Sequence, residues 1–250
     1  MKKTIFTVLI ILSVLLSFIA CDGTVDKVYL GGSSSKHTGN GIVSETNTTR
    51  TNCDWVQLWE GGPKFAAFNV GATITSYTSA TTTDTNIVGG LYTWGGTQDA
   101  RTSYTDDHCT ATDTTLTSAS DTATRLWGAN WRMPTKADLE ALTSTTNCTW
   151  IWCSGETGSQ YETGCALAGY KVSGIGDYEN DSIFLPAAGD YSANTDIENV
   201  NSKGYYWSTM PKKSDNNEGA NYLSFESNKK EITGNWIKYG YSVRAVYTGK

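Results

Sequence analysis

The chain is poor in basic residues. It has 19 lysines and arginines against 25 aspartates and glutamates among its 250 residues, and its formal net charge is -6. Beyond the two N-terminal lysines, the only adjacent basic pairs are Lys212-Lys213 and Lys229-Lys230. Proteins that bind nucleic acid concentrate positive charge on one face to contact the phosphates. The composition therefore excludes nucleic acid as a partner.

Histidine is scarcer still, with two residues in the whole chain. Neither His37 nor His108 stands in a nucleophile motif such as Gly-x-Ser-x-Gly, so nothing supports a hydrolytic triad. His108 follows Asp106 and Asp107, and we expect it to be a solvated residue of an acidic loop. The sequence thus predicts a protein that is not an enzyme, with no catalytic residue and no cofactor.

One long apolar run occurs, near the N-terminus. A basic start precedes apolar residues 5–16, and segment 17–21 reads Ser-Phe-Ile-Ala-Cys. This layout is typical of a signal peptide and is too short for a transmembrane helix. The last five residues resemble a lipobox, which implies a signal peptide at 1–20 and lipidation of Cys21. Acyl chains would anchor the protein in the cell envelope, at the outer membrane or cell surface. A plain secretory signal is the alternative.

The remaining cysteines are odd in number, so they cannot all pair with one another. In an oxidising compartment at least one thiol is free or bonded to another molecule. Cys153 and Cys165 flank a polar stretch and can staple a hairpin, whereas Cys148 looks like a small buried apolar residue. The five residues are Cys53, Cys109, Cys148, Cys153 and Cys165.

Composition divides the mature chain into two parts. Residues 21–53 are rich in Gly, Ser, Thr and Asn and have few large apolar side chains, so we expect a flexible tether that starts at Cys21. Aromatic residues recur from Asp54 onward, which predicts one folded domain over residues 54–250. Within it, the Thr- and Ser-rich stretches 73–86 and 110–124 are expected to be surface loops.

The domain has one strong helix signal and several strand signals. Thr135 and Asp138 form a capping box, and Leu139 and Leu142 give the apolar stripe of a helix. In the strand candidate 221–225, the apolar residues Leu223 and Phe225 share one face, and Tyr222 and Ser224 share the other. A hairpin turn is expected near residues 227–228. The strand candidates are 183–187, 205–209, 221–225, 229–233 and 241–247.

Six motifs in order carry a resemblance to a known family. They resemble the Fibrobacter succinogenes major paralogous domain, a family of exported bacterial proteins that are often lipoproteins, over about residues 55–248. The motifs are Phe-Asn-Val-Gly-Ala at 68–72, Gly-Leu-Tyr-Thr-Trp-Gly at 90–95, Trp-Gly through Trp-Arg-Met-Pro-Thr at 127–135, Ile-Phe-Leu-Pro-Ala-Ala-Gly at 183–189, Gly-Tyr-Tyr-Trp-Ser-Thr at 204–209 and Gly-Tyr-Ser-Val-Arg-Ala-Val at 240–246.

This resemblance implies an α+β protein with a C-type lectin-like fold, related to that of formylglycine-generating enzymes. Such a fold combines twisted antiparallel sheets with one or two helices and long loops. The enzymes need a late pair of cysteines to hold copper, and no cysteine follows Cys165. The Glu-Pro-Asn or Gln-Pro-Asp motif of calcium-dependent lectins is also missing, so no metal is expected. The acidic stretch 99–107 is the one place where a calcium ion is conceivable.

The segment before the last strand predicts a binding surface. It mixes rigid aromatic rings with short amides, as paratopes do, and we expect exposed loops at 216–221 and 235–239. The sequence therefore predicts a surface-anchored adhesin-like or receptor-like module for an extracellular protein or glycan. A structural coat protein without a discrete ligand is the alternative. The candidate ligand-binding residues are Asn216, Asn217, Asn221, Tyr222, Asn235, Trp236 and Tyr239.

Overall fold

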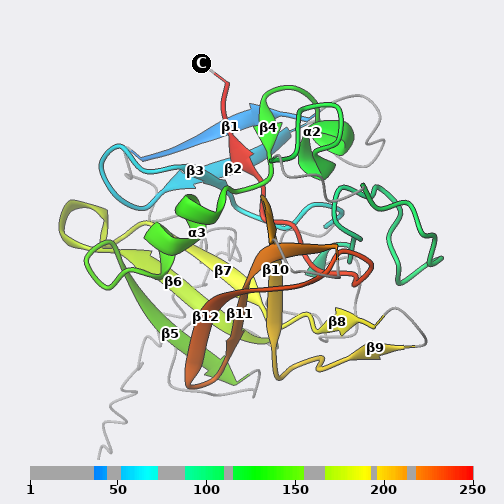
Figure 1. The fold of residues 1–250 in the computed structure, drawn as a ribbon. Coiled ribbons are helices and arrows are strands. Elements are labelled where there is room, and N and C mark those ends of the chain that lie inside the picture. Colours follow the sequence, from blue (N-terminus) through cyan, green and yellow to red (C-terminus); the bar gives the residue numbers. More distant parts are fainter. Residues whose placement is uncertain are drawn as a thin grey trace, which may run out of the picture.

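Antiparallel sheets and two α-helices, α2 (Thr122–Trp127) and α3 (Lys136–Thr143), make up most of the described chain, which is α+β as predicted (Figure 1). The described ranges also contain a 3-10 turn, η1 (Gly176–Tyr178). No helix in the described ranges is long and apolar enough to span a bilayer. The predicted signal peptide, Cys21, Cys165, Asn216, Asn217 and loop 73–86 lie outside these ranges. The computed structural model describes residues 37–43, 52–72, 88–109, 115–154, 167–192, 196–212 and 218–249.

One sheet joins the beginning and the end of the folded chain. Its strand order is β1-β2-β3-β13-β4, so the C-terminal strand lies between β3 and β4 (Figure 1). All of its pairings are antiparallel. The strands are β1 (Thr38–Ile42), β2 (Asn52–Gln57), β3 (Lys64–Ala66), β4 (Trp131–Arg132) and β13 (Val246–Tyr247).

Strand β1 corrects the predicted tether. It pairs with β2 over its whole length, and Cys53 is 2% exposed. The folded domain therefore begins before the predicted boundary at Asp54. The sequence pattern missed this strand because β1 contributes backbone hydrogen bonds and little apolar surface. At Gly39, a Cβ atom would clash with the Trp55 indole, so the bare backbone allows the ring to lie against the strand.

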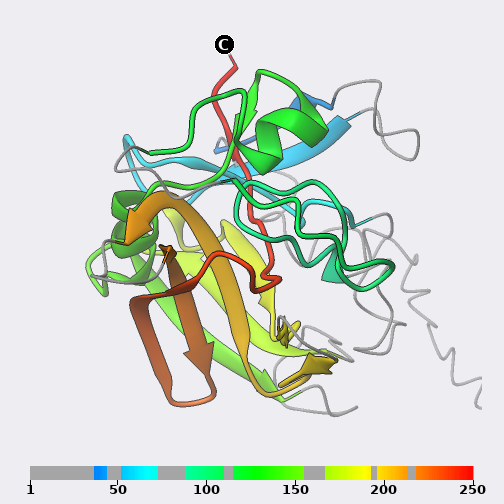
Figure 2. The same cartoon turned by 45° about the vertical axis from the view of Figure 1, so that its right-hand side comes forward.

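Two three-stranded antiparallel meanders and a short hairpin complete the described fold (Figures 1 and 2). The β8–β9 hairpin lies beside the start of β10 in both views, where Gly189 bridges to Gly204. The first meander is β5 (Cys148–Ser154), β6 (Ala168–Gly174) and β7 (Ser182–Pro186), and the second is β10 (Gly204–Lys212), β11 (Gly219–Glu226) and β12 (Lys229–Trp236), with β8 (Asp190–Tyr191) and β9 (Ile197–Glu198) between them.

Strand β11 separates two buried apolar clusters. Leu223 and Phe225 belong to a cluster shared with β6, β7 and α3. Tyr222 belongs to the other, which contains the buried tryptophans Trp94 and Trp207. The predicted division of this strand into two faces is confirmed. Because fully burying one large apolar side chain stabilises a fold by about 1.5–3 kcal/mol, both faces of this sheet contribute to the core.

The predicted capping box is also confirmed. The Thr135 side chain accepts a hydrogen bond from the backbone N–H of Asp138, and the Asp138 carboxylate accepts one from the backbone N–H of Thr135. Arg132 donates to the same carboxylate at 2.6 Å. Leu139 and Leu142 are each 1% exposed. Helix α3 thus begins at the predicted place and buries the predicted stripe against the second meander.

Most predicted strands match β7, β10, β11 and β12, and a turn joins β11 to β12 at residues 227–228. The last prediction was too long, since regular pairing covers only β13 and residues 241 and 242 form isolated bridges. Arg244 holds this segment in place without a strand: it is 1% exposed and donates to the carbonyls of Ala66 and Phe184. One buried guanidinium therefore ties the first sheet to β7.

The predicted surface loop at 110–124 is wrong at its end. Helix α2 begins at Thr122, and Asp121 caps it by accepting a hydrogen bond from the backbone N–H of Thr124 at 2.8 Å. Thr122 and Ala123 are buried. The Ser- and Thr-rich composition concealed an N-cap, because the same small polar residues favour both turns and helix starts.

Two described cysteines agree with the prediction that at least one thiol does not pair within the chain. Cys109 and Cys148 are free thiols. Cys148 is 2% exposed, and burial raises the pKa of its thiol to about 12. It is therefore inert at neutral pH, as expected of a small buried apolar residue. The proposed partner of Cys153, Cys165, lies outside the described residues.

Candidate ligand-binding surface

The second meander has one face buried in the cluster shared with α3 and an opposite face, here called the outward face, that is only partly open, because Trp207 and Tyr222 on it are buried. Side chains alternate along each strand, and Tyr206, Leu223 and Phe225 point into the cluster shared with α3. The residues of opposite parity include Tyr205 and Ser224, which are cross-strand neighbours and partly exposed. The open part of the outward face therefore offers the Ser224 hydroxyl and the Tyr205 ring to solvent.

Four tyrosines gather on this outward face. Tyr205 stacks on Tyr241 with ring centroids 5.0 Å apart and planes 15° apart. Tyr222 and Tyr239 lie 4.7 Å and 5.9 Å from Tyr241. Tyr241 and Tyr222 are buried at 1% and 7% exposure, whereas Tyr205 and Tyr239 are partly exposed. We call these four residues the tyrosine face: two buried rings form its base, and two open rings form its surface.

Asn235 holds the base of the tyrosine face in place. Its Nδ2 donates to the hydroxyl oxygen of Tyr241 at 2.8 Å, and its Oδ1 accepts from the backbone N–H of Trp236 at 2.8 Å. An amide bonded on both sides has one orientation. Asn235 therefore positions Tyr241, on which both open rings pack.

Carboxylates surround the tyrosine face. Burial raises the pKa of Tyr205 well above its usual range, and the carboxylates of Asp190, Glu226 and Glu198 raise it further. Burial also raises the pKa of Tyr222 and Tyr241. The phenols are therefore neutral at physiological pH and are available as hydrogen-bonding groups.

A second exposed feature adjoins the tyrosine face at the end of β12. Trp236 is 41% exposed, and the Lys238 ammonium lies 5.4 Å from its ring centroid. Lys238 also forms an ion pair with Asp106 at 2.6 Å. Tyr104 stacks on Tyr191 at 5.1 Å. Two regions singled out from the sequence, the acidic stretch 99–107 and the segment before the last strand, thus meet in space.

His108 is more enclosed than predicted. Its side chain is 15% exposed, and its Nδ1 lies 2.5 Å from Asp106 and its Nε2 4.0 Å from Glu218. The expectation of a freely solvated loop histidine is therefore wrong. Sequence reasoning missed the contact with Glu218 because the two residues are more than a hundred positions apart in the chain.

Four of the predicted ligand-binding residues occupy strands. Asn221 belongs to β11, and Asn235 and Trp236 end β12, so the expectation of exposed loops is wrong for these three. Tyr222, in the expected strand, is a buried ring. Asn221 donates to the carbonyls of Met210 and Pro211, across the irregular part of the β10–β11 pairing. Its amide is therefore occupied by the fold. Tyr222, Asn235 and Tyr239 come together, whereas Asn221 does not join them.

The sequence reasoning missed Tyr205 and Asp190. Tyr205 stands in the strand candidate 205–209, where alternation with the buried Tyr206 could have placed it outward. Asp190 has no such signal, because the β8–β9 hairpin alone brings it to the tyrosine face.

The acidic stretch uses its carboxylates to hold its own backbone. Asp107 accepts hydrogen bonds from the backbone N–H groups of Thr97 and Gln98, and Asp99 accepts from those of Leu91 and Arg101. In the described ranges, no three His, Cys, Asp or Glu side chains are arranged to hold a metal ion. These carboxylates act as loop caps.

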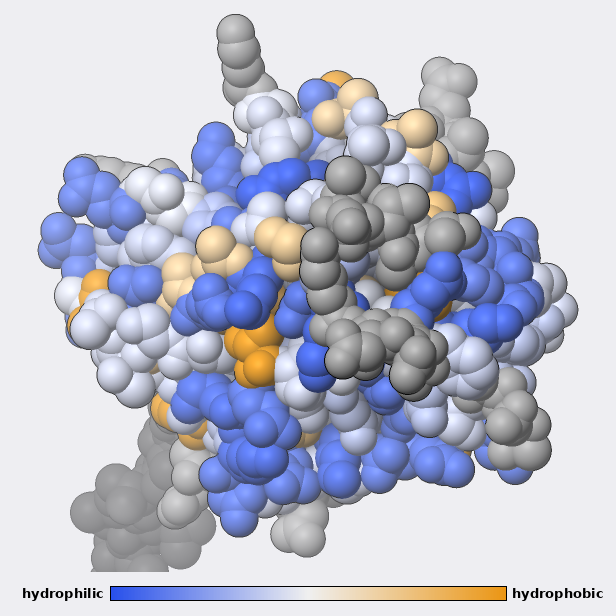
Figure 3. All heavy atoms as spheres, viewed as in Figure 1, coloured by the Kyte–Doolittle hydropathy of each residue, from blue (hydrophilic) through white to orange (hydrophobic). Residues whose placement is uncertain are grey.

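Apolar groups are dispersed over the surface. Figure 3 shows one side of the molecule as mostly hydrophilic, with apolar residues in small separate spots. The large hydrophobic residues that are exposed in the described chain come from different elements. They are Ile42, Ile151, Ile175, Ile197, Met210 and Trp236.

Comparison with known proteins leaves the family open. No family model, no curated protein and no solved structure matches the chain. The resemblance to the major paralogous domain family stays a prediction, and the function has to be inferred from the geometry of the surface.

Proposed function

We propose that this chain is a cell-envelope lipoprotein of the major paralogous domain family, with a C-type lectin-like fold, and that it binds an extracellular ligand. The observation that carries the proposal is the tyrosine face: two open rings on a buried aromatic base, held by Asn235 and bordered by carboxylates. Rings that are fixed before binding lose little conformational entropy when a ligand arrives.

A glycan suits this surface better than a protein partner does. Aromatic rings pack against the CH groups of a sugar, while hydroxyl, amide and carboxylate groups bond its hydroxyls. Ser224, Thr233 and Glu231 supply such groups on the outward face. Protein interfaces instead centre on a desolvated apolar patch, and the exposed apolar residues of the described chain are dispersed. A protein ligand is the other outcome of the test below.

The structural-coat role is the competing function. It requires no discrete site, and the dispersed apolar surface is compatible with it. The two functions differ in one respect: a coat protein has no use for partly exposed rings that pack on a buried ring fixed by a side-chain hydrogen bond. Substitution of the open rings therefore separates them.

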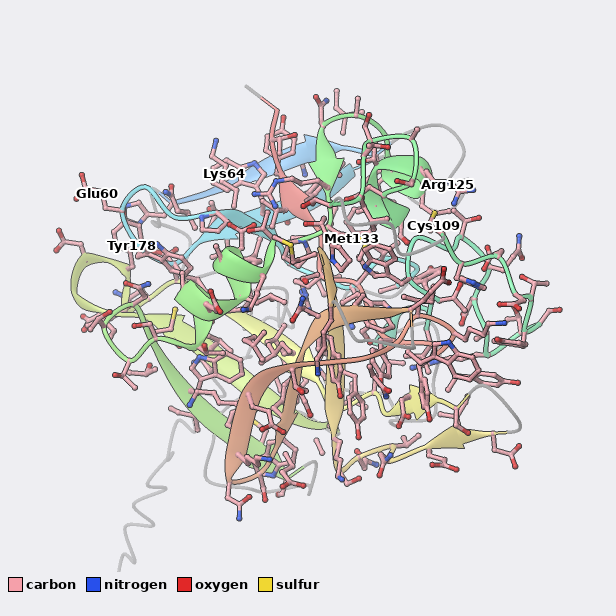
Figure 4. The ribbon with its side chains drawn as sticks, viewed as in Figure 1. Glu60, Lys64, Cys109, Arg125, Met133 and Tyr178 are labelled. Atoms are coloured by element: carbon pink, nitrogen blue, oxygen red, sulfur yellow. The ribbon has the colours of Figure 1, made fainter. Side chains whose placement is uncertain are left out.

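The test is binding of the full chain, in mild detergent, to arrays of glycans and of extracellular proteins. The variant Tyr205→Leu/Tyr239→Ala removes the open rings and leaves the buried base. Tyr178→Ala is the matched control, because it also removes a stacked tyrosine ring: Tyr178 stacks on His37 with ring centroids 3.8 Å apart. Tyr178 lies on the opposite side of the molecule from Cys109 and Arg125 (Figure 4). Circular dichroism verifies that both variants fold.

Binding that is lost in the double variant and kept in Tyr178→Ala supports a recognition module. Binding of the original chain to glycan spots identifies the ligand class proposed here. Binding to protein spots only would mean that the ligand is a protein instead of a glycan. A folded chain that binds nothing on either array overturns the proposal in favour of the coat role.

A further inference from the structure

Two carboxylates of the β8–β9 hairpin carry like charges at adjacent positions. Asp190 and Glu198 are direct cross-strand partners, and like charges in such positions repel each other. Asp190 is 6% exposed and accepts one hydrogen bond, from the Asn199 amide at 2.8 Å. In the described part of the chain, no lysine or arginine forms an ion pair with either one.

The other carboxylates near the tyrosine face differ in this respect. Glu226 lies 3.9 Å from the Lys203 ammonium, and Glu231 lies 2.8 Å from that of Lys229. Their charges are compensated on the protein itself. Burial and the neighbouring Glu198 raise the pKa of Asp190, whereas the Asn199 hydrogen bond and the charge of Lys203 lower it. Lys203 thus acts on both Glu226 and Asp190, so one cation faces three carboxylates, and the excess negative charge lies at the hairpin edge of the tyrosine face.

The hairpin carboxylates act on the open ring of Tyr205. Tyr191 bridges to Gly240 beside Tyr241, and Gly189 bridges to Gly204 beside Tyr205, so the hairpin is fastened to both segments that carry the rings. The carboxylates of Asp190 and Glu198 both raise the pKa of Tyr205, in addition to its burial. A ligand lying on Tyr205 therefore meets negative charge at this edge.

From this charge pattern we infer that the ligand is a glycan with unacetylated amino sugars, whose ammonium groups lie at Asp190 and Glu198 while the sugar rings pack on Tyr205 and Tyr239. This inference rests on the proposed function and narrows it. An ammonium group relieves the repulsion between the two carboxylates and forms charge-assisted hydrogen bonds with them. Uronic acids and phosphate-bearing glycans are repelled.

The arrangement of the rings favours an amino sugar over a quaternary ammonium ligand. An aromatic cage surrounds such a cation with ring faces, whereas here the open rings lie along a strand face and the segment that follows β12. An open aromatic surface with charge at one edge suits a sugar ring that carries an amine. Choline serves as the probe for the rejected case.

The experiment compares two oligosaccharides of equal length that differ in one group. Isothermal titration of the full chain is carried out with glucosamine oligomers and with their N-acetylated counterparts. Each charge-assisted contact is worth about 1.5 kcal/mol or more, so we expect the unacetylated oligomer to bind roughly tenfold more tightly. Asp190→Asn and Glu198→Gln should reduce this preference, and Tyr205→Leu/Tyr239→Ala should abolish binding of both oligomers. Glu140→Gln, on α3, is the charge-matched control.

The outcomes separate this inference from the proposed function. Equal binding of both oligomers, lost with the tyrosines and unaffected by Asp190→Asn, overturns the amino-sugar inference and leaves the glycan-binding role in place. Binding of choline in preference to the oligomers also overturns it. Binding of the cationic oligomer that survives loss of the tyrosines and disappears in salt is mere charge attraction and contradicts it. Failure of every ligand, here and on the arrays, removes the proposed function itself.

Discussion

Shortening the chain to begin at Asp54 is expected to destabilise the domain strongly, although the sequence alone suggests that start. The deletion removes β1 and the first two residues of β2. Val43 and Cys53, at 3% and 2% exposure, leave the core with it. The carbonyl of Ile42 no longer accepts the hydrogen bond from the Trp131 indole. The deletion therefore opens both the sheet edge and the core beneath it.

The magnitude follows from these contacts. Burial of the two side chains contributes about 2–4 kcal/mol together, and the Trp131 and Gln57 hydrogen bonds to Ile42 and His37 contribute about 1 kcal/mol each. The loss of about 4–6 kcal/mol is a large share of the roughly 5–15 kcal/mol that stabilises a domain. For a domain of this size, each kcal/mol lowers the Tm by about 2–4 °C. We therefore expect the Tm to fall by about 10–20 °C.

The assay is thermal unfolding followed by circular dichroism, with chains that begin at His37 and at Asp54. The chain from His37 keeps β1 and also the ion pair between His37 and Asp181 at 2.8 Å. We expect it to unfold at the temperature of the full chain. Equal Tm values for the two shortened chains would refute the reasoning, because β1 would then contribute nothing to the fold.

Three smaller predictions concern single side chains. Burial raises the pKa of Asp121 above its usual range, so the folded state holds this proton more tightly than the unfolded state does. The free energy of unfolding contributed by Asp121 therefore falls as the pH rises from the unfolded-state pKa toward the folded-state pKa. Urea titrations at several pH values should show this dependence in the original chain and not in Asp121→Asn. Thr135→Ala removes the cap of α3 and should cost about 1 kcal/mol by urea unfolding, with Thr143→Ala near zero. Asn235→Ala removes the hydrogen bond to the Tyr241 hydroxyl and should weaken glycan binding severalfold while it lowers the Tm by only about 2–4 °C. Unchanged affinity would show that the base needs no such support.

Local patterns predicted the elements whose stability is local. The capping box at Thr135 and Asp138, the two faces of β11 and the turn after Glu226 depend on residues a few positions apart. Such features can be derived from one sequence, because their partners are within the same segment.

Elements that depend on distant partners escaped prediction. Strand β1 has little apolar surface of its own and exists because β2 pairs with it. Helix α2 is short and begins in a Thr-rich stretch, and its cap is also fixed by Met133, whose backbone N–H donates to Asp121 at 2.8 Å. His108 lies near Glu218, the residue before β11. Each of these features depends on a contact with another segment of the chain, and local composition does not reveal such a contact.

The candidate site shows the same division. The aromatic and amide content of the segment before the last strand drew attention to Asn235 and Tyr239, which lie together around Tyr241. Strand parity then decided which side chains are available, since it buried Tyr222 and committed Asn221 to the backbone of β10. Asp190 entered through the pairing of two-residue strands, which no periodicity could reveal.

The most direct test of the tyrosine face is an NMR titration of the full chain, with tyrosine rings labelled, using the glycan that the arrays or the titrations identify. We expect the ring signals of Tyr205 and Tyr239 to shift with the affinity measured by calorimetry, while the signal of Tyr178 stays in place. A saturable shift at Tyr178 or elsewhere, with Tyr205 and Tyr239 unchanged, would contradict the assignment of this face as the binding site.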